Sequence, residues 1–363
     1  MTATFPAIVG HPRPKRSLAA AIAGTPGHAY LFLGPTGVGK HSVAVAFARA
    51  LNCARHTSGD SPPSLFDDQP SLPAARGDAC GDCRSCRLID AGTHPDVRVI
   101  DRLTGADERR ARAPRNISVE VVRAATIDAT RRPEMGGRRV YIIHRADELS
   151  LPGFDALLKT LEEPASSVTF LLTAVDEGLI PSTILSRCLI VRFGPVPRPD
   201  LKDFLVIQHG AEDSLAERIA RAADGSPAIA LELLADGAEG KRRLGYFAEA
   251  LTLSRASVAD RLARVDALMR THSGDPARTT ELLRALTLVW RDVVLAHTAQ
   301  REHAVLTGLQ PDAEALNRAL RLDAARDALV ALVSAKRQLD ENVQTRMALE
   351  LLLMRLPVPG PAG

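Results

Sequence analysis

The sequence predicts an α/β domain built on a mostly parallel sheet, followed by an all-helical remainder of the chain. The apolar run HAYLFLG (28–34) precedes a Gly-rich loop and the helical pattern VAVAFARALNC (43–53), which is the opening of an α/β nucleotide-binding fold. Strand and helix patterns then alternate to about residue 195, as expected for a sheet covered on both faces. After residue 200 the sequence contains no further strand pattern.

The elements of the first part follow from apolar periodicity and helix signals. Ser118 is a suitable N-cap for a helix that runs to about Thr130, and Pro164 ends the helix that begins at 151. The strands are predicted at 28–34, 97–100, 140–143, 168–174 and 189–193, and the helices at 43–53, 118–130 and 151–164.

Shifts in composition predict the domain boundaries. Residues 54–79 are rich in Ser, Pro, Asp and Gly, which is typical of a long insertion, and GPVPRPD (194–200) has three prolines in seven residues. Apolar residues recur at the helical period between Lys241 and Leu356. The predicted division is an α/β domain at 1–195 with an inserted cysteine module at about 53–90, a small helical domain at 196–240, a larger helical domain at 241–356 and a disordered tail at 357–363.

The composition of the 363-residue chain limits the classes of function. Hydrophobic residues make up 45%, enough for a sizeable core, whereas aromatic residues make up 4%, which argues against stacking platforms for single-stranded nucleic acid. The formal charge of +3 neither requires nor excludes a nucleic-acid partner. Because we find no signal-peptide pattern and no apolar run of membrane-spanning length, we expect a cytoplasmic protein with no membrane partner.

A phosphate-binding loop is predicted at GPTGVGK (34–40), between a strand and a helix. Its glycines let backbone N–H groups point into one concavity, and the helix N-terminus and the Lys40 ammonium add positive potential. The alternative is a Gly-rich turn that binds no ligand. The candidate nucleotide-binding residues are Gly34, Thr36, Gly37, Gly39, Lys40, His41, Ser42 and, at the end of the strand 168–174, Thr173.

The metal position of this loop is altered. A Ser or Thr hydroxyl is expected after the lysine to hold Mg²⁺, but this chain has His41, and an imidazole is not the hard oxygen ligand that Mg²⁺ prefers. Ser42 comes one residue later, where the helix has rotated its side chain by about 100°. We therefore expect that ATP or ADP, where bound, is not hydrolysed.

The acids of an active nucleotide hydrolase are also missing. They are needed directly after the strand VYII, where this chain has His144 and Arg145. Asp147 and Glu148 follow, but about one turn beyond the metal position, and we expect them to cap the next helix. Together with the altered loop, these residues predict loss of hydrolysis.

Three cysteines within seven residues predict zinc chemistry and not a disulfide framework. Tetrahedral zinc takes four ligands, and Cys53 is the natural fourth because the insertion at 54–79 can loop out between the two halves. A filled site is structural, and free thiols are the alternative. Cys188, beside a strand start, is expected to be a small buried hydrophobic residue. The predicted zinc ligands are Cys53, Cys80, Cys83 and Cys86.

Arg187 follows the polar-ended strand VTFLLTA, in the segment SRC. An Arg at a subunit edge can reach the γ-phosphate on a neighbouring subunit and stabilise its transition state. On the residues alone, a single Arg in a loop is usually a solvated surface residue. Thr173 has a similar alternative, a satisfied hydroxyl at the edge of the core.

The order of these motifs resembles that of bacterial clamp-loader AAA+ subunits of DNA polymerase III. The segments that carry the resemblance cover about residues 5–195 and are HAYLFLGPTGVGK, the four cysteines, VYIIHRADELS, DALLKTLEEP and TILSRC. In that family the motor subunits, gamma and tau, keep an Asp-Glu pair after the VYII-like strand and a Thr after the loop lysine. This chain has His144, Arg145 and His41 there, so it is similar to the subunit type that does not hydrolyse ATP.

The resemblance implies a rigid stator in a five-subunit ring with gamma or tau and delta subunits, which opens the beta sliding clamp and places it on primed DNA. It implies that Arg187 acts as an arginine finger in trans, and that Lys159 faces DNA unless it is an ordinary solvated helix residue. It further implies that 196–240 is a lid and 241–356 an oligomerising collar. Pro227 stands where a motor subunit would carry a sensing Arg.

Three other functions stay open at the level of sequence. A motor-type ATPase would show Mg²⁺-dependent turnover. A zinc-dependent DNA-binding regulator would bind DNA tightly with a steep salt dependence, although the sequence has no basic stripe or aromatic platform. A pure scaffold would give Arg187 no role.

Overall fold

The computed structural model describes residues 4–57, 78–104, 116–135, 137–235, 238–272, 276–298, 316, 318–340 and 343–359. Contacts divide the chain into two compact units, Met1–Leu201 with Ser226–Ala228, and Lys202–Gly225 with Ile229–Gly363. Most of the predicted insertion at 54–79 and the last four residues of the predicted tail lie outside the described residues. The finer division into lid and collar domains stays a prediction.

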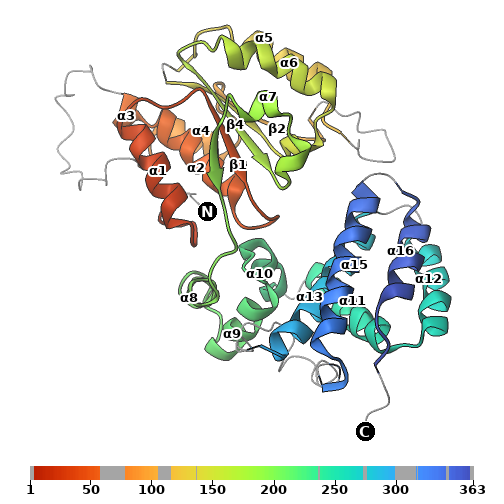
Figure 1. Cartoon of the computed structure of the whole chain (residues 1–363). Coiled ribbons are helices and arrows are strands. Elements are labelled where there is room, and N and C mark those ends of the chain that lie inside the picture. Colours follow the sequence, from red (N-terminus) through yellow and green to blue (C-terminus); the bar gives the residue numbers. More distant parts are fainter. Residues whose placement is uncertain are drawn as a thin grey trace. The chain divides into compact units, whose positions relative to one another are not determined.

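The first unit contains a five-stranded parallel sheet (Figure 1). Its strands stand in the order β2-β3-β4-β1-β5. The bounds are β1 Ala29–Leu33, β2 Val97–Ile100, β3 Arg139–Ile143, β4 Val168–Ala174 and β5 Leu189–Arg192. The predicted α/β fold with a parallel sheet is confirmed, and each predicted strand lies within one residue of its predicted bounds.

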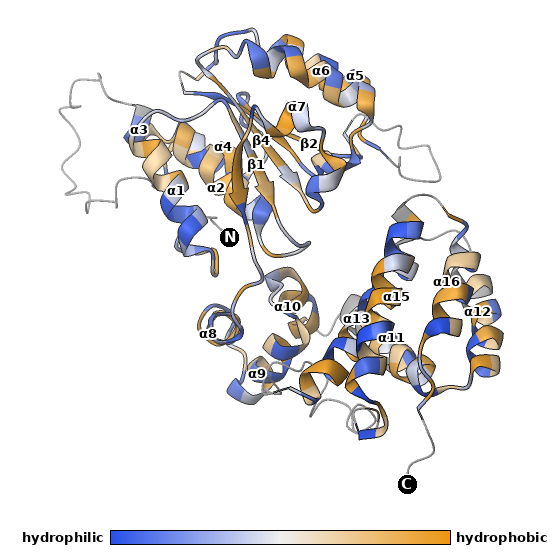
Figure 2. Cartoon of the chain, viewed as in Figure 1, coloured by the Kyte–Doolittle hydropathy of each residue, from blue (hydrophilic) through white to orange (hydrophobic). Residues whose placement is uncertain are grey.

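Helices cover both faces of this sheet (Figure 1). Alternate residues of β4 enter two different apolar clusters, Phe170 with the α5–α6 face and Leu171 with the α2 face, and Figure 2 shows β1 and β4 as largely apolar. The helices are α1 Pro12–Ala23, α2 Lys40–Asn52, α3 Ala54–Thr57, α4 Arg84–Asp90, α5 Val119–Asp128, α6 Leu151–Glu162 and α7 Ser182–Leu185, with short 3₁₀ turns at η1 Ala146–Glu148 and η2 Glu177–Leu179. The start of α5 is as predicted, because the Ser118 hydroxyl accepts the Glu120 amide at 3.2 Å.

The strand register brings the candidate residues to one edge of the sheet. Leu33 pairs with Ala174, and Ile143 pairs with Leu172. The carboxyl ends of β1, β3 and β4 therefore meet at the same edge, where ligands bind in open α/β sheets.

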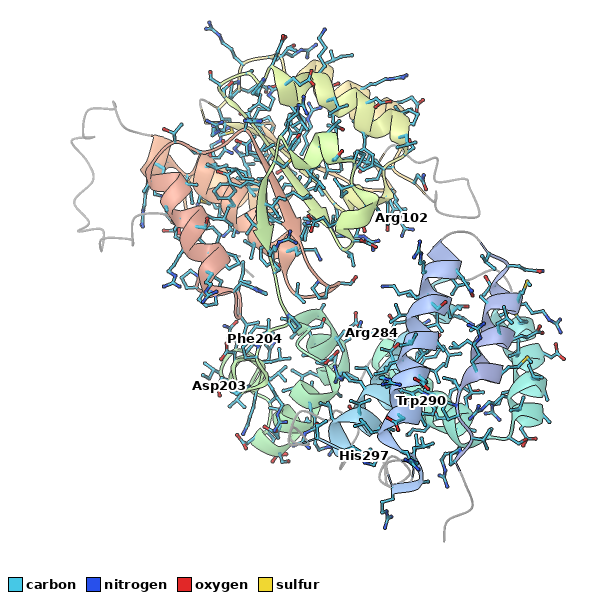
Figure 3. All side chains as sticks on the ribbon, viewed as in Figure 1. Arg102, Asp203, Phe204, Arg284, Trp290 and His297 are labelled. Atoms are coloured by element: carbon cyan, nitrogen blue, oxygen red, sulfur yellow. The ribbon has the colours of Figure 1, made fainter. Side chains whose placement is uncertain are left out.

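The second unit is helical throughout its described residues. An apolar cluster around Trp290 joins residues 247–356 of this unit; Trp290 is the single tryptophan of the chain and is labelled on α13 in Figure 3. No helix among the described residues combines the length and the apolar content that a membrane span needs. The helices are α8 Arg198–His209, whose first turn belongs to the first unit, α9 Asp213–Ala222, α10 Pro227–Leu234, α11 Ala238–Arg255, α12 Val258–His272, α13 Pro276–Ala296, α15 Leu322–Asp340 and α16 Thr345–Arg355.

A fully buried arginine joins two helix ends in this unit. Arg261, at the start of α12, donates to carbonyl oxygens at the end of α11 and at and beyond the end of α16. The five acceptors are the carbonyls of Leu253, Ser254, Leu353, Leu356 and Pro357. Carbonyl groups at a helix C-terminus lack intrahelical donors and carry partial negative charge, so a guanidinium suits them.

Candidate functional site

The phosphate loop has the backbone shape that its glycines allow. Gly34 and Gly37 have φ angles of 154° and 78°, which side chains disfavour. A Cβ on Gly34 would lie 2.2 Å from the Phe193 carbonyl oxygen, and one on Gly37 would lie 2.3 Å from the Ser226 hydroxyl. Packing against backbone therefore requires glycine at position 34, whereas at position 37 the left-handed backbone favours it, because the Ser226 hydroxyl can rotate away.

Lys40 lies against this loop. Its ammonium donates to the carbonyl oxygens of Gly34 at 2.6 Å and Pro35 at 2.7 Å, and 7% of the residue is exposed. Burial lowers the pKa of Lys40 to about 8, Asp147 opposes that shift, and Arg145 adds to it. The predicted residues Thr36 and Ser42 are exposed on the same loop and first helical turn, and Gly39 directly precedes Lys40.

Two histidines occupy the expected metal position. The rings of His41 and His144 lie edge to face with their centroids 5.2 Å apart. Burial lowers the pKa of both imidazoles, and the nearby charges of Arg145 and Lys40 lower that of His144 further. Thr173, fully buried, has its hydroxyl 3.4 Å from the Nδ1 atom of His144. The structure thus brings His41, His144 and Thr173 together. The acid whose charge acts on both imidazoles is Asp101, directly after β2, which raises their pKa against the effect of burial.

The residues after β3 are held by an ion pair. Arg145 has a left-handed backbone with φ of 57°, its amide donates to Thr173 at 3.0 Å, and its Nε donates to Asp147 at 2.9 Å. The Asp147 carboxylate, which is buried, also accepts the Val175 amide at 3.3 Å, and Glu148 lies 3.3 Å from Arg145.

The prediction that Asp147 and Glu148 cap the following helix is wrong. The N-cap of α6 is Ser150, and its side chain makes no capping hydrogen bond. Asp147 turns inward instead, because a neighbouring guanidinium and the amide after β4 satisfy its carboxylate there. The Arg-x-Asp spacing was the available sequence signal for this pair.

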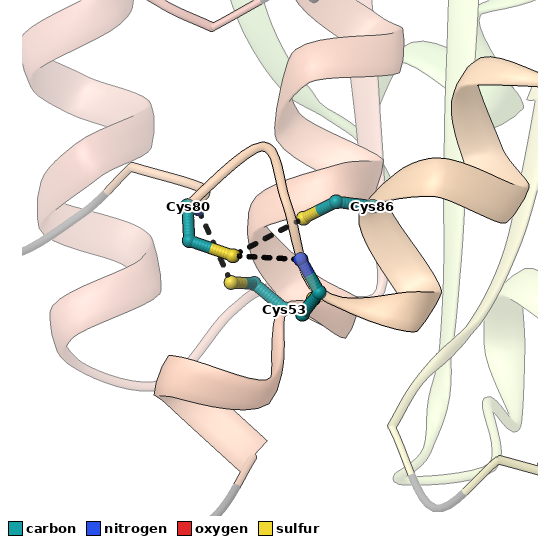
Figure 4. A group of neighbouring side chains, drawn as sticks. Cys53, Cys80 and Cys86 are labelled. Atoms are coloured by element: carbon teal, nitrogen blue, oxygen red, sulfur yellow. Dashed lines mark hydrogen bonds between the residues drawn. The ribbon is translucent and has the colours of Figure 1, made fainter. Parts of the chain in front are cut away.

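The four cysteines of the predicted module form one cluster (Figure 4). Their sulfur atoms lie within 4.8 Å of one another, although Cys53 ends α2 and Cys86 lies in α4. The Cys80 amide donates to the Cys53 sulfur and the Cys83 amide donates to the Cys80 sulfur, each at 3.3 Å. Four convergent thiols with such N–H donors are a donor set that fits tetrahedral zinc.

Cys188 is separate from this cluster. It packs against the apolar cluster on the α5–α6 face, and burial raises the pKa of its thiol to about 12. This position agrees with the predicted small hydrophobic residue.

Arg187 lies between α7 and β5, outside the group at the phosphate loop. Its guanidinium donates to Glu162 of α6 at 2.7 Å and to the Thr183 carbonyl at 2.8 Å, and a third of the side chain is exposed. Lys159 is exposed on α6.

Comparisons with known proteins agree with the fold and the motifs. A sequence model of the family described as DNA polymerase III, delta subunit, matches residues 11–197. The chain is 35% identical to DNA polymerase III subunit delta' of Pseudomonas aeruginosa over 207 residues, which are 57% of this chain and 51% of that protein. It is 31% identical to DNA polymerase III subunit tau of Bacillus subtilis over 308 residues, 78% of this chain and 48% of that protein. This chain spans about half the length of these relatives.

Among solved structures, a gamma subunit-related protein of DNA polymerase III from Thermotoga maritima matches 94% of this chain and 97% of its own, at 17% identity and a TM-score of 0.45. A TM-score of that size does not establish a shared fold, so membership of a protein family is judged from the sequence matches alone. The family model covers more than half of the chain, and so the chain belongs to the DNA polymerase III delta-subunit family.

Proposed function

We propose that this chain is a clamp-loader subunit of the delta prime type, a stator without ATPase activity that helps to load the beta sliding clamp onto primed DNA. One observation carries the proposal. Two imidazoles and a guanidinium stand where ATP hydrolysis needs a hydroxyl and carboxylates.

Hydrolysis needs Mg²⁺ held by hard oxygen ligands and a group that orients the attacking water. Burial lowers the pKa of His41 and His144, so both imidazoles are neutral at neutral pH. Their ring nitrogens are also not the hard oxygen ligands that Mg²⁺ prefers. Arg145 adds a positive charge beside them. The carboxylate of Asp147, the first acid after β3, already accepts hydrogen bonds from Arg145 and from the Val175 amide. This combination disfavours a divalent cation.

The phosphate loop supports a second part of the proposal, that ATP or ADP binds without being hydrolysed. Lys40 is held by two carbonyl oxygens of its own loop, and desolvation lowers its pKa. A phosphate group would give this ammonium an anionic partner, and the N-terminus of α2 adds favourable potential.

Arg187 is proposed as the arginine finger for a neighbouring gamma or tau subunit. Its ion pair with Glu162 is solvent-exposed on both sides, and exposed pairs of this kind contribute about 0–1 kcal/mol. A γ-phosphate presents more charge than one carboxylate, so the guanidinium can exchange Glu162 for the phosphate at little cost.

The cysteine cluster is proposed to hold one structural zinc ion through Cys53, Cys80, Cys83 and Cys86. All four positions of a tetrahedral ion are then filled by this chain, which leaves no position for a substrate. The ion would tie the end of α2 to the start of α4.

The partners follow from the same proposal. They are gamma or tau and delta subunits, the beta clamp and primed DNA, with 196–240 as the lid and 241–356 as the collar. Lys159 of α6 is the proposed contact with DNA.

The test is DNA-stimulated ATP hydrolysis by a loader reconstituted from this chain with gamma or tau and delta subunits. The isolated chain serves as the blank and is expected to be silent. Arg187→Ala is expected to slow the neighbouring site by about 10³-fold, which in a ring with several ATPase sites is a partial loss of total rate. Arg192→Ala is the matched control, because it also removes an exposed Arg–Glu pair from the first unit and should leave the rate unchanged.

Two outcomes contradict the proposal. Turnover by the isolated chain would identify a motor-type ATPase, which is the second candidate because tau subunits match this chain at similar identity. If the isolated chain shows no turnover and loaders with wild-type chain and with Arg187→Ala hydrolyse ATP at equal rates, the chain would be a scaffold that supplies no arginine finger.

A further inference from the structure

Strand β2 is an edge strand, and its outer side has no neighbouring strand among the described residues. The carbonyls of Asp96 and Ile100 accept amides from β3 and the residue after it, at 2.7 and 2.8 Å. Backbone groups alternate in direction along a strand, so Val97 and Val99 direct theirs away from β3. Within the described part of the chain, the Val99 amide and carbonyl have no hydrogen-bond partner.

A groove of about 650 Å³ follows this edge. Apolar side chains line it from both faces of the sheet, with Val45 from the α2 face and Val121 and Ala125 from the α5 face. Val99 is 44% exposed. An open strand edge between two apolar walls is the geometry that accepts one more strand.

His94 lines the same groove and carries an unsatisfied donor. Its Nδ1 atom accepts the Asp96 amide at 3.1 Å, so the neutral ring carries its proton on Nε2. The Nε2 atom is buried without a hydrogen-bond partner among the described residues, and the residue is 4% exposed. A buried N–H group without an acceptor costs free energy, which a carbonyl or carboxylate oxygen would recover.

Two charged side chains line the groove, Arg98 and Glu134, and Glu134 already has Arg139 as a cation at 3.8 Å. The side chain of Arg98 is 53% exposed, and its Nη1 lies 3.3 Å from an oxygen of Asp128. The Asp128 carboxylate also forms ion pairs with Arg139 at 2.8 Å and with Arg131 at 3.8 Å. Arg98 therefore shares its acid with two other cations and has N–H groups for a second carboxylate.

We propose that an extended peptide segment of another protein adds to the outer edge of β2 as a sixth strand. The segment is apolar on both sides, because both walls of the groove are apolar, and it carries one Asp or Glu that reaches Arg98. Residues 105–115, which follow β2 in sequence, have four arginines and no large apolar side chain, so this chain's own segment does not match that chemistry.

The test uses the full-length chain and a fluorescent pool of hexapeptides, capped at both ends, with Val, Ile or Thr at four central positions and Asp or Glu at one flank. One comparison pool carries Lys at that flank, and another carries N-methyl groups on the central amides. Saturable binding in the micromolar range is expected for the acidic pool, measured by fluorescence polarisation. The Val99 amide should be protected from hydrogen exchange when the pool is bound.

Val99→Pro removes the outward amide while leaving the β2–β3 ladder intact, because that amide is not part of the ladder. We expect binding at least tenfold weaker, whereas Val99→Thr, which keeps the amide, should bind like the wild type. Arg98→Gln should remove the preference for the acidic pool over the Lys pool.

The proposal is overturned if no pool binds saturably, or if the N-methylated pool binds the wild type as well as the unmethylated one. The second comparison needs no variant, so it decides the matter even where Val99→Pro does not fold.

Discussion

Loss of the Arg261 side chain should strongly destabilise the second unit. The side chain is fully buried and donates to five carbonyl oxygens of α11, α16 and the residues that follow α16. Among the described residues, no acid within ion-pair distance of its guanidinium compensates the charge. Arg261→Met keeps a long unbranched chain and removes every donor.

The magnitude follows from two opposing effects. Hydrogen bonds to a charged group contribute about 1.5–3 kcal/mol each, so five independent bonds would sum to more than the whole stability of an ordinary domain. They are not independent, and removing the buried charge also removes its desolvation cost. Arg261→Met leaves five carbonyl oxygens without this donor, and a buried acceptor without a partner costs about 1–3 kcal/mol, so after the offset we expect a net loss of about 3–5 kcal/mol. For a unit of this size it lowers Tm by roughly 6–20 °C.

The assay is thermal and urea unfolding followed by tryptophan fluorescence. Trp290 is the single tryptophan and lies in the core of the same unit, so its signal reports on that unit alone. Arg264→Met is the matched control: it lies one turn away on α12, pairs with Glu249 and is 47% exposed, so it should cost less than about 1 kcal/mol. Equal stability of the two variants would refute the reasoning.

Three further predictions concern the first unit. The wild type should contain zinc by elemental analysis; Cys86→Ser should lose it and Cys188→Ser should keep it, and equal metal content in both variants would exclude the cluster as the site. Asp96→Asn should lower the free energy of unfolding, measured by circular-dichroism melts, by about 3 kcal/mol, because the buried carboxylate accepts two amide hydrogen bonds at 2.8 Å and one guanidinium hydrogen bond at 3.2 Å. A loss under about 1 kcal/mol would contradict the importance of these hydrogen bonds. Burial lowers the pKa of His144 below 6.5, so the unfolded chain binds protons more readily and the free energy of unfolding falls as pH drops below about 6.5. His144→Gln should make the free energy of unfolding, measured by urea titration, depend less on pH. An unchanged pH dependence would contradict this.

Much of the first unit could be predicted because its signals are local. Apolar runs gave the five strands to within one residue, and the Ser118 cap marked the start of α5. Cys53 could be assigned to the cluster across 27 residues of sequence because it ends a helix and the remaining three cysteines lacked a fourth partner.

One wrong prediction, for Asp147, and one residue on which the sequence analysis made no prediction, Arg261, both depend on contacts between distant residues. Asp147 stands where local pattern favours a helix cap, but its carboxylate accepts an amide 28 residues away, at the end of β4. Arg261 looks like a solvated residue on an amphipathic helix, and arginine is rarely buried without a partner. Its burial requires two helix ends to converge on one point, which periodicity alone does not reveal.

The phosphate loop shows why a retained motif is weak support for retained chemistry. Local structure favours glycine at both positions, 34 and 37, since a Cβ at 34 would lie 2.2 Å from the Phe193 carbonyl oxygen and the backbone at 37 has φ of 78°. Lys40 is likewise anchored by carbonyls of its own loop. These residues can therefore persist for structural reasons, whether or not the site hydrolyses a nucleotide. The residues that discriminate between a motor and a stator are the ones the loop does not constrain, and at those positions this chain has two neutral imidazoles.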